Sequence, residues 1–286
     1  MKFVYKQNWA EQKTIKEQLS FIENIEEFPS LPSVVLPLLS KLNDPYVSVK
    51  EIEKLINMDP GLVSYILKLT NSLLFGLLEE VYSMARAIIL IGMSNLRSLV
   101  TSYSIRVLCN TITHSDIQEY IWNHSLTTAV FSKVISERIY GVKKNASTYV
   151  FGLLHDVGKI VLYIHNPQNF QDALIRAIGK NMDFVSSEKQ IFGFSHIEAG
   201  YLMIEKLRFS KQMKDVVLHH HNPEFSAKGD NNSWIVSLAN DLAHNLYDNK
   251  AISMDKYLEK FKISDEALVD LIRVGQYQVE QYRSLL

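Results

Sequence analysis

Two residues that can bind a hard or borderline cation, His155 and Asp156, stand side by side in the segment FGLLHDVGKIVLY, residues 151–163. Apolar residues at helical spacing precede the pair, and a second apolar run follows Gly158. The pattern predicts that the pair lies near the end of a helix whose body belongs to the core. Because neighbouring side chains on a helix point about 100° apart, the pair can reach one cation, or flank two, only if ligands arrive from other helices.

The overall composition narrows the class of protein that positions this pair. The 286 residues are 47% hydrophobic and 21% charged, with only 11 glycines and 7 prolines, which favours a soluble, helical fold of one or two domains. The 30 basic and 31 acidic side chains give a formal net charge of −1, so no global field draws the chain to nucleic acid or to an anionic membrane. The basic residues also form no stripe of the nucleic-acid-binding kind.

Cysteine content and the absence of long apolar runs indicate the compartment. Cys109 is the only cysteine, which excludes an internal disulfide and a two-cysteine zinc site. The first 18 residues lack the apolar core of a signal peptide, and no run approaches the roughly 18 apolar residues that a membrane span needs. We therefore expect a cytoplasmic protein without a membrane segment.

Helix start and stop signals divide the first part of the chain into helices. Ser33 is expected to cap one helix, the pair Ser48 and Glu51 forms a capping box for the next, and Asp59-Pro60 supplies a cap and a first-turn proline. Gly92 is expected to end another. The predicted helices are 9–27, 33–42, 48–58, 60–72, 84–91 and 94–108.

The second part of the chain is also predicted to be helical. A long amphipathic helix, 115–140, is closed by Gly141, and the helix of the His155–Asp156 pair follows it. Ser195 and Glu198 form a second capping box. No strand of period two and no internal repeat occurs in the sequence. The further predicted helices are 167–178, 186–192, 196–207, 211–221, 232–247, 254–260 and 265–284.

Several separated phrases resemble the HDOD domain, the HD-related output domain of bacterial signalling proteins. They are FPSLPSVVLPLLSKLNDPYVSVKEIEKLINMDPGLVSYILKLTNSLLFG, SMARAIILIGMSNLRSLV, IWNHSLTTAVFSKVISERI and FGLLHDVGKIVLY, and they occur in the family's order over about residues 25–225. The resemblance implies an all-α HDOD-type fold, with a helical N-terminal lobe over about 1–110 and an HD-like lobe over about 111–286. It also implies a regulatory protein of the kind whose biochemical activity is often undefined.

The resemblance extends to the enzymatic relatives, the HD phosphohydrolases, which hold one or two metal ions. It implies a divalent metal here, one or two ions of Fe, Mn, Zn, Ni or Mg. Lys159, one turn after the pair, resembles the family's phosphate-contacting lysine, so Lys159 and Asp156 are the candidate catalytic residues. The positions that match the ligands are His124, the pair His155 and Asp156, His196, His219 or His220 in VVLHHHNP, and Asp241 in SLANDLAH.

This mixture of donors suits hydrolysis of a phosphoester. Imidazoles are neutral, borderline ligands, whereas carboxylates bring charge and can bridge two cations about 3.5–4 Å apart, where a shared water can attack phosphorus. Each residue alone also has a structural explanation. His124 would then be a hydrogen-bonded core histidine, Asp241 a solvated helix residue, His196 a first-turn polar residue and Lys159 an exposed lysine. The histidine run 219–221 would complement a helix dipole.

Departures from the enzymatic pattern limit the possible substrates. After the histidine run the chain lacks the Gly-Tyr-Pro phrase of the cyclic-di-GMP-degrading branch. Tyr120 stands where some relatives with three metals carry a glutamate, which argues against a third ion. The sequence also contains no nucleophile elbow for Ser-His-Asp catalysis, no phosphate-binding loop and no Rossmann fingerprint.

Two functions remain. The first is a signalling or regulatory module that acts through contacts with a protein partner. The second is a metal-dependent phosphohydrolase acting on a nucleotide-like phosphoester. An enzyme must keep an open coordination position, whereas a structural site is closed, and Phe75 or Leu77 could plug the cleft. The sequence leaves open the metal, the substrate, the partner and the oligomeric state, and the six predicted ligands are His124, His155, Asp156, His196, His220 and Asp241.

Overall fold

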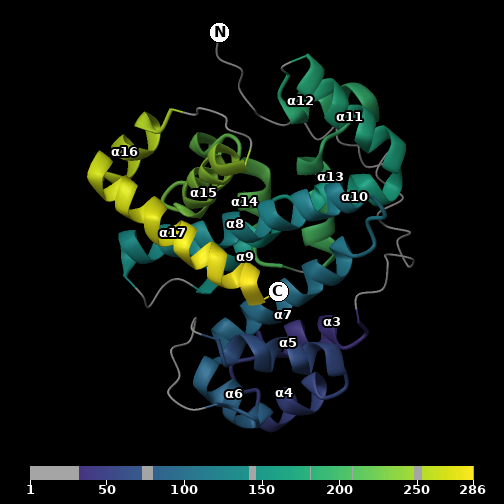
Figure 1. Cartoon of the computed structure of the whole chain (residues 1–286), viewed down its shortest axis with the longest axis vertical. Helices are drawn as coiled ribbons and strands as arrows, with labels where there is room; N and C mark the ends of the chain where they lie inside the picture. The colour runs from purple at the N-terminus through teal and green to yellow at the C-terminus, as the bar shows by residue number, and fades with distance from the viewer. Residues whose placement is uncertain are drawn as a thin grey trace. The chain divides into compact units, whose positions relative to one another are not determined.

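The structure is a computed structural model that describes residues 32–72, 80–141, 146–180, 182–207, 209–247 and 253–285, and every regular element in these ranges is a helix (Figure 1). The predicted all-α fold is therefore confirmed. The predicted helix 9–27 and the residues Phe75 and Leu77 lie outside the described ranges.

The chain forms two compact units. Of the described residues, the smaller unit comprises those in 156–210, and the larger comprises those in 32–155 and 211–285. The boundary between them falls between His155 and Asp156. The lobe boundary near residue 110 falls between two helices of the larger unit and stays a prediction.

The second and third described helices of the larger unit begin where the sequence signals place them. Ser48 and Glu51 form the predicted capping box, and the Asp59 carboxylate accepts a hydrogen bond from Leu62 N at 3.0 Å. The first helix differs, because it begins at Val35 without a side-chain cap from Ser33, and the Pro32 carbonyl accepts from Val35 N at 2.8 Å instead. The helices are α3 Val35–Lys41, α4 Val49–Ile56, α5 Pro60–Thr70, α6 Met84–Ile91 and α7 Met93–Cys109.

Asp59 joins α5 to α7 as well as capping α5. Its carboxylate also accepts from the Tyr103 hydroxyl at 3.1 Å, and burial together with this carboxylate raises the pKa of Tyr103 to about 12. Asp59→Ala removes both bonds, and we expect the free energy of unfolding to fall by about 1–2 kcal/mol in chemical denaturation. Asp59→Asn keeps a cap acceptor and should lose less. Equal stability of the alanine variant and the wild type would contradict this role.

The helices α6 and α7 meet at Gly92, whose φ of 78° is favoured by glycine. No single helix in the described ranges is long and apolar enough to cross a bilayer, although α6 and α7 pass that test together with a bend of 111° between them.

Cys109, the last residue of α7, is buried and free. Burial raises the pKa of its thiol to about 12, so it has little thiolate to offer as a nucleophile.

The core of the larger unit is built around the long helix α8, Ser115–Tyr140, which ends at the predicted Gly141 with φ 77°. It packs against α7, against α9, Ala146–Leu154, and against the later helices α15 and α17. A Cβ on Gly275 of α17 would overlap the Phe131 ring of α8, so α17 approaches α8 closely (Figure 1). The later helices are α14 Lys211–His219, a 3-10 turn Pro223–Phe225, α15 Asn232–Tyr247, α16 Asp255–Phe261 and α17 Asp265–Leu285.

The smaller unit is a set of four described helices. They are α10 Val157–His165, α11 Pro167–Gly179, α12 Phe184–Phe192 and α13 His196–Lys206. The helices α11 and α12 lie side by side, and α10 packs on α13 (Figure 1). The predicted capping box of Ser195 and Glu198 opens α13 and so fixes the position of His196, the first residue of that helix.

Candidate metal centre

Three buried histidines from separate segments of the larger unit come together, and we call them the histidine cluster: His124, His155 and His220. His124 lies in α8, His155 directly after α9, and His220 directly after α14. The Nε2 atoms of His124 and His155 are 3.3 Å apart, and the ring centroids of His155 and His220 are 4.9 Å apart. These three predicted ligands therefore lie near one another in the larger unit.

Backbone carbonyl groups orient two of the three rings. His155 Nδ1 lies 2.7 Å from the Gly152 carbonyl oxygen, and His220 Nδ1 lies 2.9 Å from that of Val217. A carbonyl oxygen only accepts, so each Nδ1 carries a proton and donates it. A neutral ring then keeps its lone pair on Nε2, and this arrangement is the usual one for histidines that bind metal ions.

The surroundings of His155 Nε2 are rich in acceptors. Asn240 Oδ1 of α15 lies 3.3 Å from His155 Nε2, and His124 Nε2 lies at the same distance from it. With the proton of neutral His155 on Nδ1, its Nε2 and the amide oxygen are both acceptors. A cation is the complement of such a set, and Asn240 was not among the predicted ligands.

Asp241, the predicted terminal carboxylate, is directed away from the histidine cluster. Its Oδ2 accepts from the Tyr257 hydroxyl at 2.5 Å and lies 3.6 Å from Lys256 Nζ. One step along a helix turns the side chain by about 100°, so the neighbour Asn240 faces His155 instead. Burial is the main reason why the pKa of Tyr257 is raised, with Asp241 adding to the effect.

The structure distinguishes between the two alternatives at the histidine run. His219 is partly exposed, with its Nε2 3.7 Å from Asp215 Oδ1, whereas His220 is buried and belongs to the histidine cluster. Burial lowers the pKa of His219, with Asp215 and Glu224 acting in the opposite direction. The position of His219 is that of a surface residue.

The smaller unit contains a buried row of alternating acids and bases. Glu188 Oε2 lies 2.6 Å from His196 Nδ1, His196 Nε2 lies 3.2 Å from Asp156 Oδ1, and Asp156 Oδ2 accepts from Lys159 Nζ at 2.6 Å. Lys159 Nζ also lies 5.5 Å from the centre of the Phe184 ring. Lys159 is therefore a buried counter-ion of Asp156. The alternative explanation, that Lys159 is an exposed lysine, is wrong.

Three residues of these clusters were missed in the sequence. Glu188 lies eight positions before His196 in α12 and matches no motif position. Asn240 adjoins the expected aspartate. His244, one turn after Asn240, has its ring centroid 4.6 Å from that of His124. The helical spacing of His244 from Asn240 was the only available signal, because both residues lie on one face of α15.

The donors of the histidine cluster fit a transition-metal ion. Imidazole nitrogens are borderline ligands that suit Zn, Fe, Ni or Cu, whereas Mg²⁺ prefers an all-oxygen set. In the larger unit His124 and His155, whose Nε2 atoms are 3.3 Å apart, would hold such an ion, with the His220 ring beside His155. A bound cation would supply Lewis-acid chemistry. The chain's own part is to keep the Nδ1 protons of His155 and His220 directed at the carbonyl oxygens of Gly152 and Val217.

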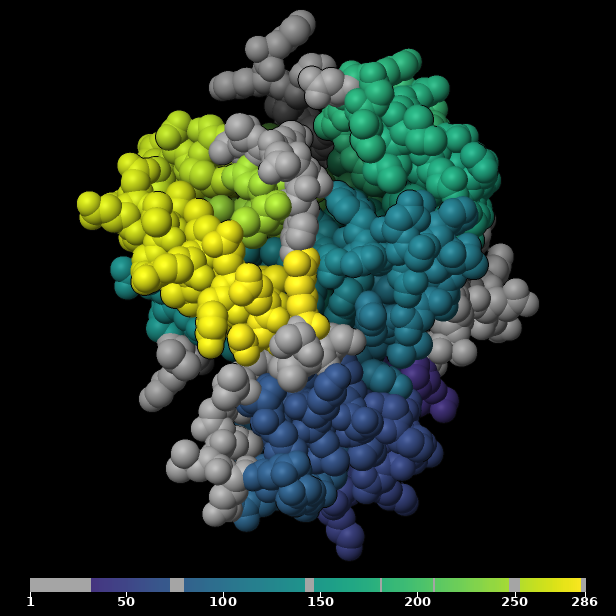
Figure 2. All heavy atoms as spheres, in the orientation of Figure 1, coloured from purple at the N-terminus to yellow at the C-terminus, as the bar shows by residue number. Residues whose placement is uncertain are grey.

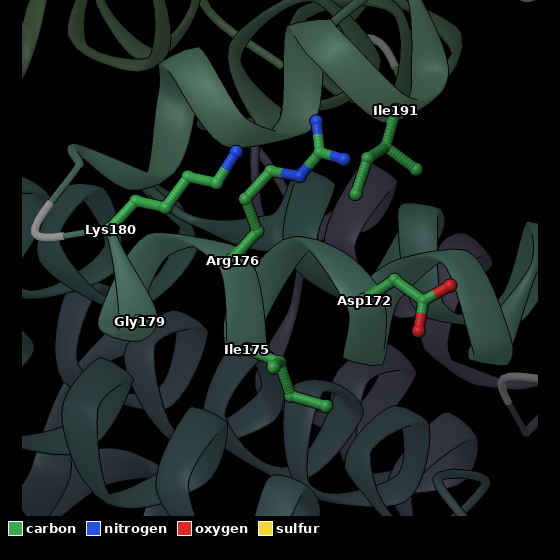
Figure 3. A pocket seen from close by; sticks show the side chains of 6 residues that line it. All are labelled: Asp172, Ile175, Arg176, Gly179, Lys180 and Ile191. Atoms are coloured by element: carbon green, nitrogen blue, oxygen red, sulfur yellow. The ribbon is translucent and has the colours of Figure 1, made fainter.

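A separate hollow of about 490 Å³ lies between α11 and α12 of the smaller unit. Figure 3 shows Arg176 and Lys180 rising from α11 towards α12, and the Arg176 guanidinium donates to Gln190 Oε1 at 3.0 Å. Its lining contains no histidine and only one carboxylate, Asp172. This hollow is therefore no candidate for the metal centre.

Comparisons with known proteins identify the fold. The family model of the HDOD domain matches residues 28–223. An HDOD domain protein of unknown function from Geobacter sulfurreducens is 26% identical with a TM-score of 0.72, over 91% of this chain and 89% of that one.

Two further solved structures share the fold. A Shewanella amazonensis SB2B protein provisionally named a phosphohydrolase has a TM-score of 0.70 at 19% identity, over 94% of this chain and 98% of that one. A Marinobacter aquaeolei VT8 protein provisionally named a signal transduction protein has a TM-score of 0.76 at 13% identity, over 96% and 65%. At these identities the likeness shows the fold alone.

Among curated proteins, an uncharacterized protein of Treponema pallidum (strain Nichols) is 26% identical over 211 residues. These residues are 73% of this chain and 40% of that protein, so the chain spans less than half the length of this relative. The family model, in contrast, covers well over half of the chain, from Phe28 to Pro223. The chain therefore belongs to the HDOD family.

Proposed function

We propose that this chain is a bacterial, cytoplasmic signalling module that acts through contacts with a protein partner and holds a divalent cation on its histidine cluster. The cation would orient α8, α9 and the end of α14 through His124, His155 and His220. The chain's buried, free Cys109 agrees with a reducing compartment. The predicted ligands Asp156 and His196 belong to the smaller unit, and their part in binding stays a prediction.

The observation that supports this proposal is where the carboxylates lie and which side chains they already bind. A second cation needs bridging carboxylates, because imidazole rings carry no charge to neutralise it. The position that faces His155 from α15 is the neutral amide of Asn240, and Asp241 is engaged by Tyr257. In the smaller unit, buried Lys159 already neutralises Asp156 at 2.6 Å. These contacts favour a single ion in a structural or regulatory role.

The surface of the N-terminal helices supports action through protein contacts. Several large apolar side chains in and beside α3, α4 and α6 are exposed, including Met58 and Ile89, each 67% exposed. Figure 2 shows the segment that carries these side chains in purple to blue. Where such side chains form a contiguous patch, they are typical of protein interaction sites. The exposed residues are Leu36, Tyr46, Met58, Tyr82, Ile89 and Leu90.

The alternative is a metal-dependent phosphohydrolase acting on a nucleotide-like phosphoester. The histidine cluster favours it, and so does the provisional name of the Shewanella amazonensis structure with the same fold. In that function Asp156 and Lys159 are the catalytic residues, with the Lys159 ammonium on the phosphate. Lys159 would then have to exchange its bond to Asp156 for one to the substrate, and this exchange costs free energy in a buried site.

Hydrolysis of generic esters distinguishes the two functions. We expect protein loaded with Mn²⁺, Fe²⁺ or Ni²⁺ to release nitrophenol from bis(p-nitrophenyl) phosphate and p-nitrophenyl phosphate no faster than the His155→Ala variant does. The reason is that the chain keeps Asp156 on Lys159 and offers Asn240 where a carboxylate would be needed. Turnover by the wild type that disappears in His155→Ala and in Lys159→Met would instead establish the phosphohydrolase.

A further inference from the structure

A polar cavity of about 430 Å³ lies among α7, α8 and α17 of the larger unit, and none of its lining residues belongs to the histidine cluster. Figure 1 shows these three helices, which contribute residues from the last turn of α7, the first turns of α8 and the last turn of α17. Cavities of this size accommodate small molecules. The lining residues are Arg106, Ser115, Gln118, Glu119, Trp122, Asn123 and Arg283.

Arg106 is held in a fixed orientation within this cavity. Its guanidinium carbon lies 4.9 Å from the centre of the Trp122 ring, and the Trp122 side chain is buried. Stacking on an indole leaves the edge of the guanidinium, with its N–H groups, available for a planar acceptor. Within the described part of the chain Arg106 forms no ion pair, so no carboxylate of that part neutralises its charge.

The charges of the lining favour an anion. The lining contains two arginines, Arg106 and Arg283, and one carboxylate, that of Glu119, and Arg106 pairs with no carboxylate of the described ranges. The Glu119 carboxylate is also turned along its own helix, where its Oε1 accepts from Asn123 Nδ2 at 3.4 Å. A ligand with one negative group would therefore balance the charge of Arg106.

The polar groups between the charges indicate that the ligand is an organic molecule. Gln118 and Asn123 present amide groups, and Ser115 presents a hydroxyl, all from successive turns of α8. The Gln118 amide is positioned by its bond to Asn110 Oδ1 at 2.8 Å. Such groups fix the orientation of a polar ligand, while the charged group supplies most of the binding free energy.

We propose that this cavity binds a small organic anion, through a carboxylate or phosphate group on the Arg106 guanidinium. The site is independent of the histidine cluster and gives the module a place to sense a small molecule. Arg106 would hold the anion through paired N–H donors. The Trp122 ring keeps the guanidinium in its stacked orientation, and Arg283 contributes a second arginine to the lining. A carboxylate and a phosphate ester share this chemistry, and the probes of the experiment distinguish them.

Isothermal titration calorimetry with benzoate, phenyl phosphate and inorganic phosphate tests the proposal on the whole chain. We expect saturable binding of at least one organic probe, and the preferred probe shows whether the group is a carboxylate or a phosphate. Arg106→Gln removes the charge and should weaken that binding at least about tenfold. Arg106→Lys keeps the charge but loses the paired donors, and should also weaken it.

Arg273→Gln is the matched control, because it removes one positive charge from an exposed position of α17, where Arg273 pairs with Asp270. We expect this variant to bind like the wild type. Thermal melting confirms that each variant is folded before titration, and Arg283→Gln provides a second test at a more exposed position of the cavity. Absence of saturable binding to the wild type, or equal weakening by Arg106→Gln and Arg273→Gln, would overturn the proposal.

Discussion

Replacing His155 by alanine is expected to abolish the uptake of a divalent transition metal. Its Nε2 lies 3.3 Å from both His124 Nε2 and Asn240 Oδ1, so it is the central donor of the histidine cluster. A site left with fewer imidazoles loses the ligands that borderline cations prefer. Elemental analysis of protein purified without chelator should give a metal content near zero for the variant and a substantial content for the wild type.

The control for this experiment is His219→Ala. His219 lies next to His220 in the sequence but is partly exposed beside Asp215, so its removal should leave the metal content unchanged. Wild-type protein that contains no metal, and takes up none from a solution of Zn²⁺ or Fe²⁺, would contradict the assignment. Equal metal loss in both variants would show that binding is not localised at His155.

The second large effect is expected for Gly158→Ala in α10. A Cβ at this position would overlap the His196 carbonyl oxygen and lie 2.7 Å from Gly200 N, both of which are backbone atoms of α13. Backbone atoms cannot turn aside as a side chain does, so α10 and α13 would have to separate. We expect the free energy of unfolding to fall by about 3 kcal/mol, measured by chemical denaturation followed by circular dichroism.

Gly179→Ala is the matched control within the same unit. Gly179 is the last residue of α11, and a Cβ there would meet no atom within 4 Å. The alanine should therefore leave stability unchanged, or raise it by up to about 1 kcal/mol, because it restricts the unfolded chain. If Gly158→Ala were as stable as Gly179→Ala, the close approach of α10 and α13 would be refuted.

Local signals in the sequence were sufficient to predict most helix boundaries. The capping boxes at Ser48 and Ser195, the Asp59-Pro60 start and the stop at Gly141 depend on hydrogen bonds within a few residues, which a sequence displays directly. The start of α3 was less well predicted. There the Pro32 carbonyl, and not the Ser33 side chain, accepts the hydrogen bond from Val35 N. Which acceptor is used depends on the path of the preceding backbone.

The candidate metal centre was predictable only in part. The order of motif residues in the chain indicated that His124, His155 and His220 come together, but it could not show which face of α15 meets them. Neighbouring positions of α15 face different directions, and it is Asn240 rather than Asp241 that lies beside His155. The packing of α15 on α8 sets the rotation of α15 about its axis. Glu188 was missed for a related reason, because a buried partner of His196 from another helix needs no fixed spacing.

The most direct test of the histidine cluster is anomalous X-ray diffraction at the metal absorption edge, from crystals grown with Zn²⁺ or Fe²⁺. The arrangement of His124, His155 and His220 predicts a single strong peak about 2.0–2.1 Å from His155 Nε2. A peak that lies elsewhere in the molecule, or no peak at saturating metal, would contradict a metal centre built on these three imidazoles.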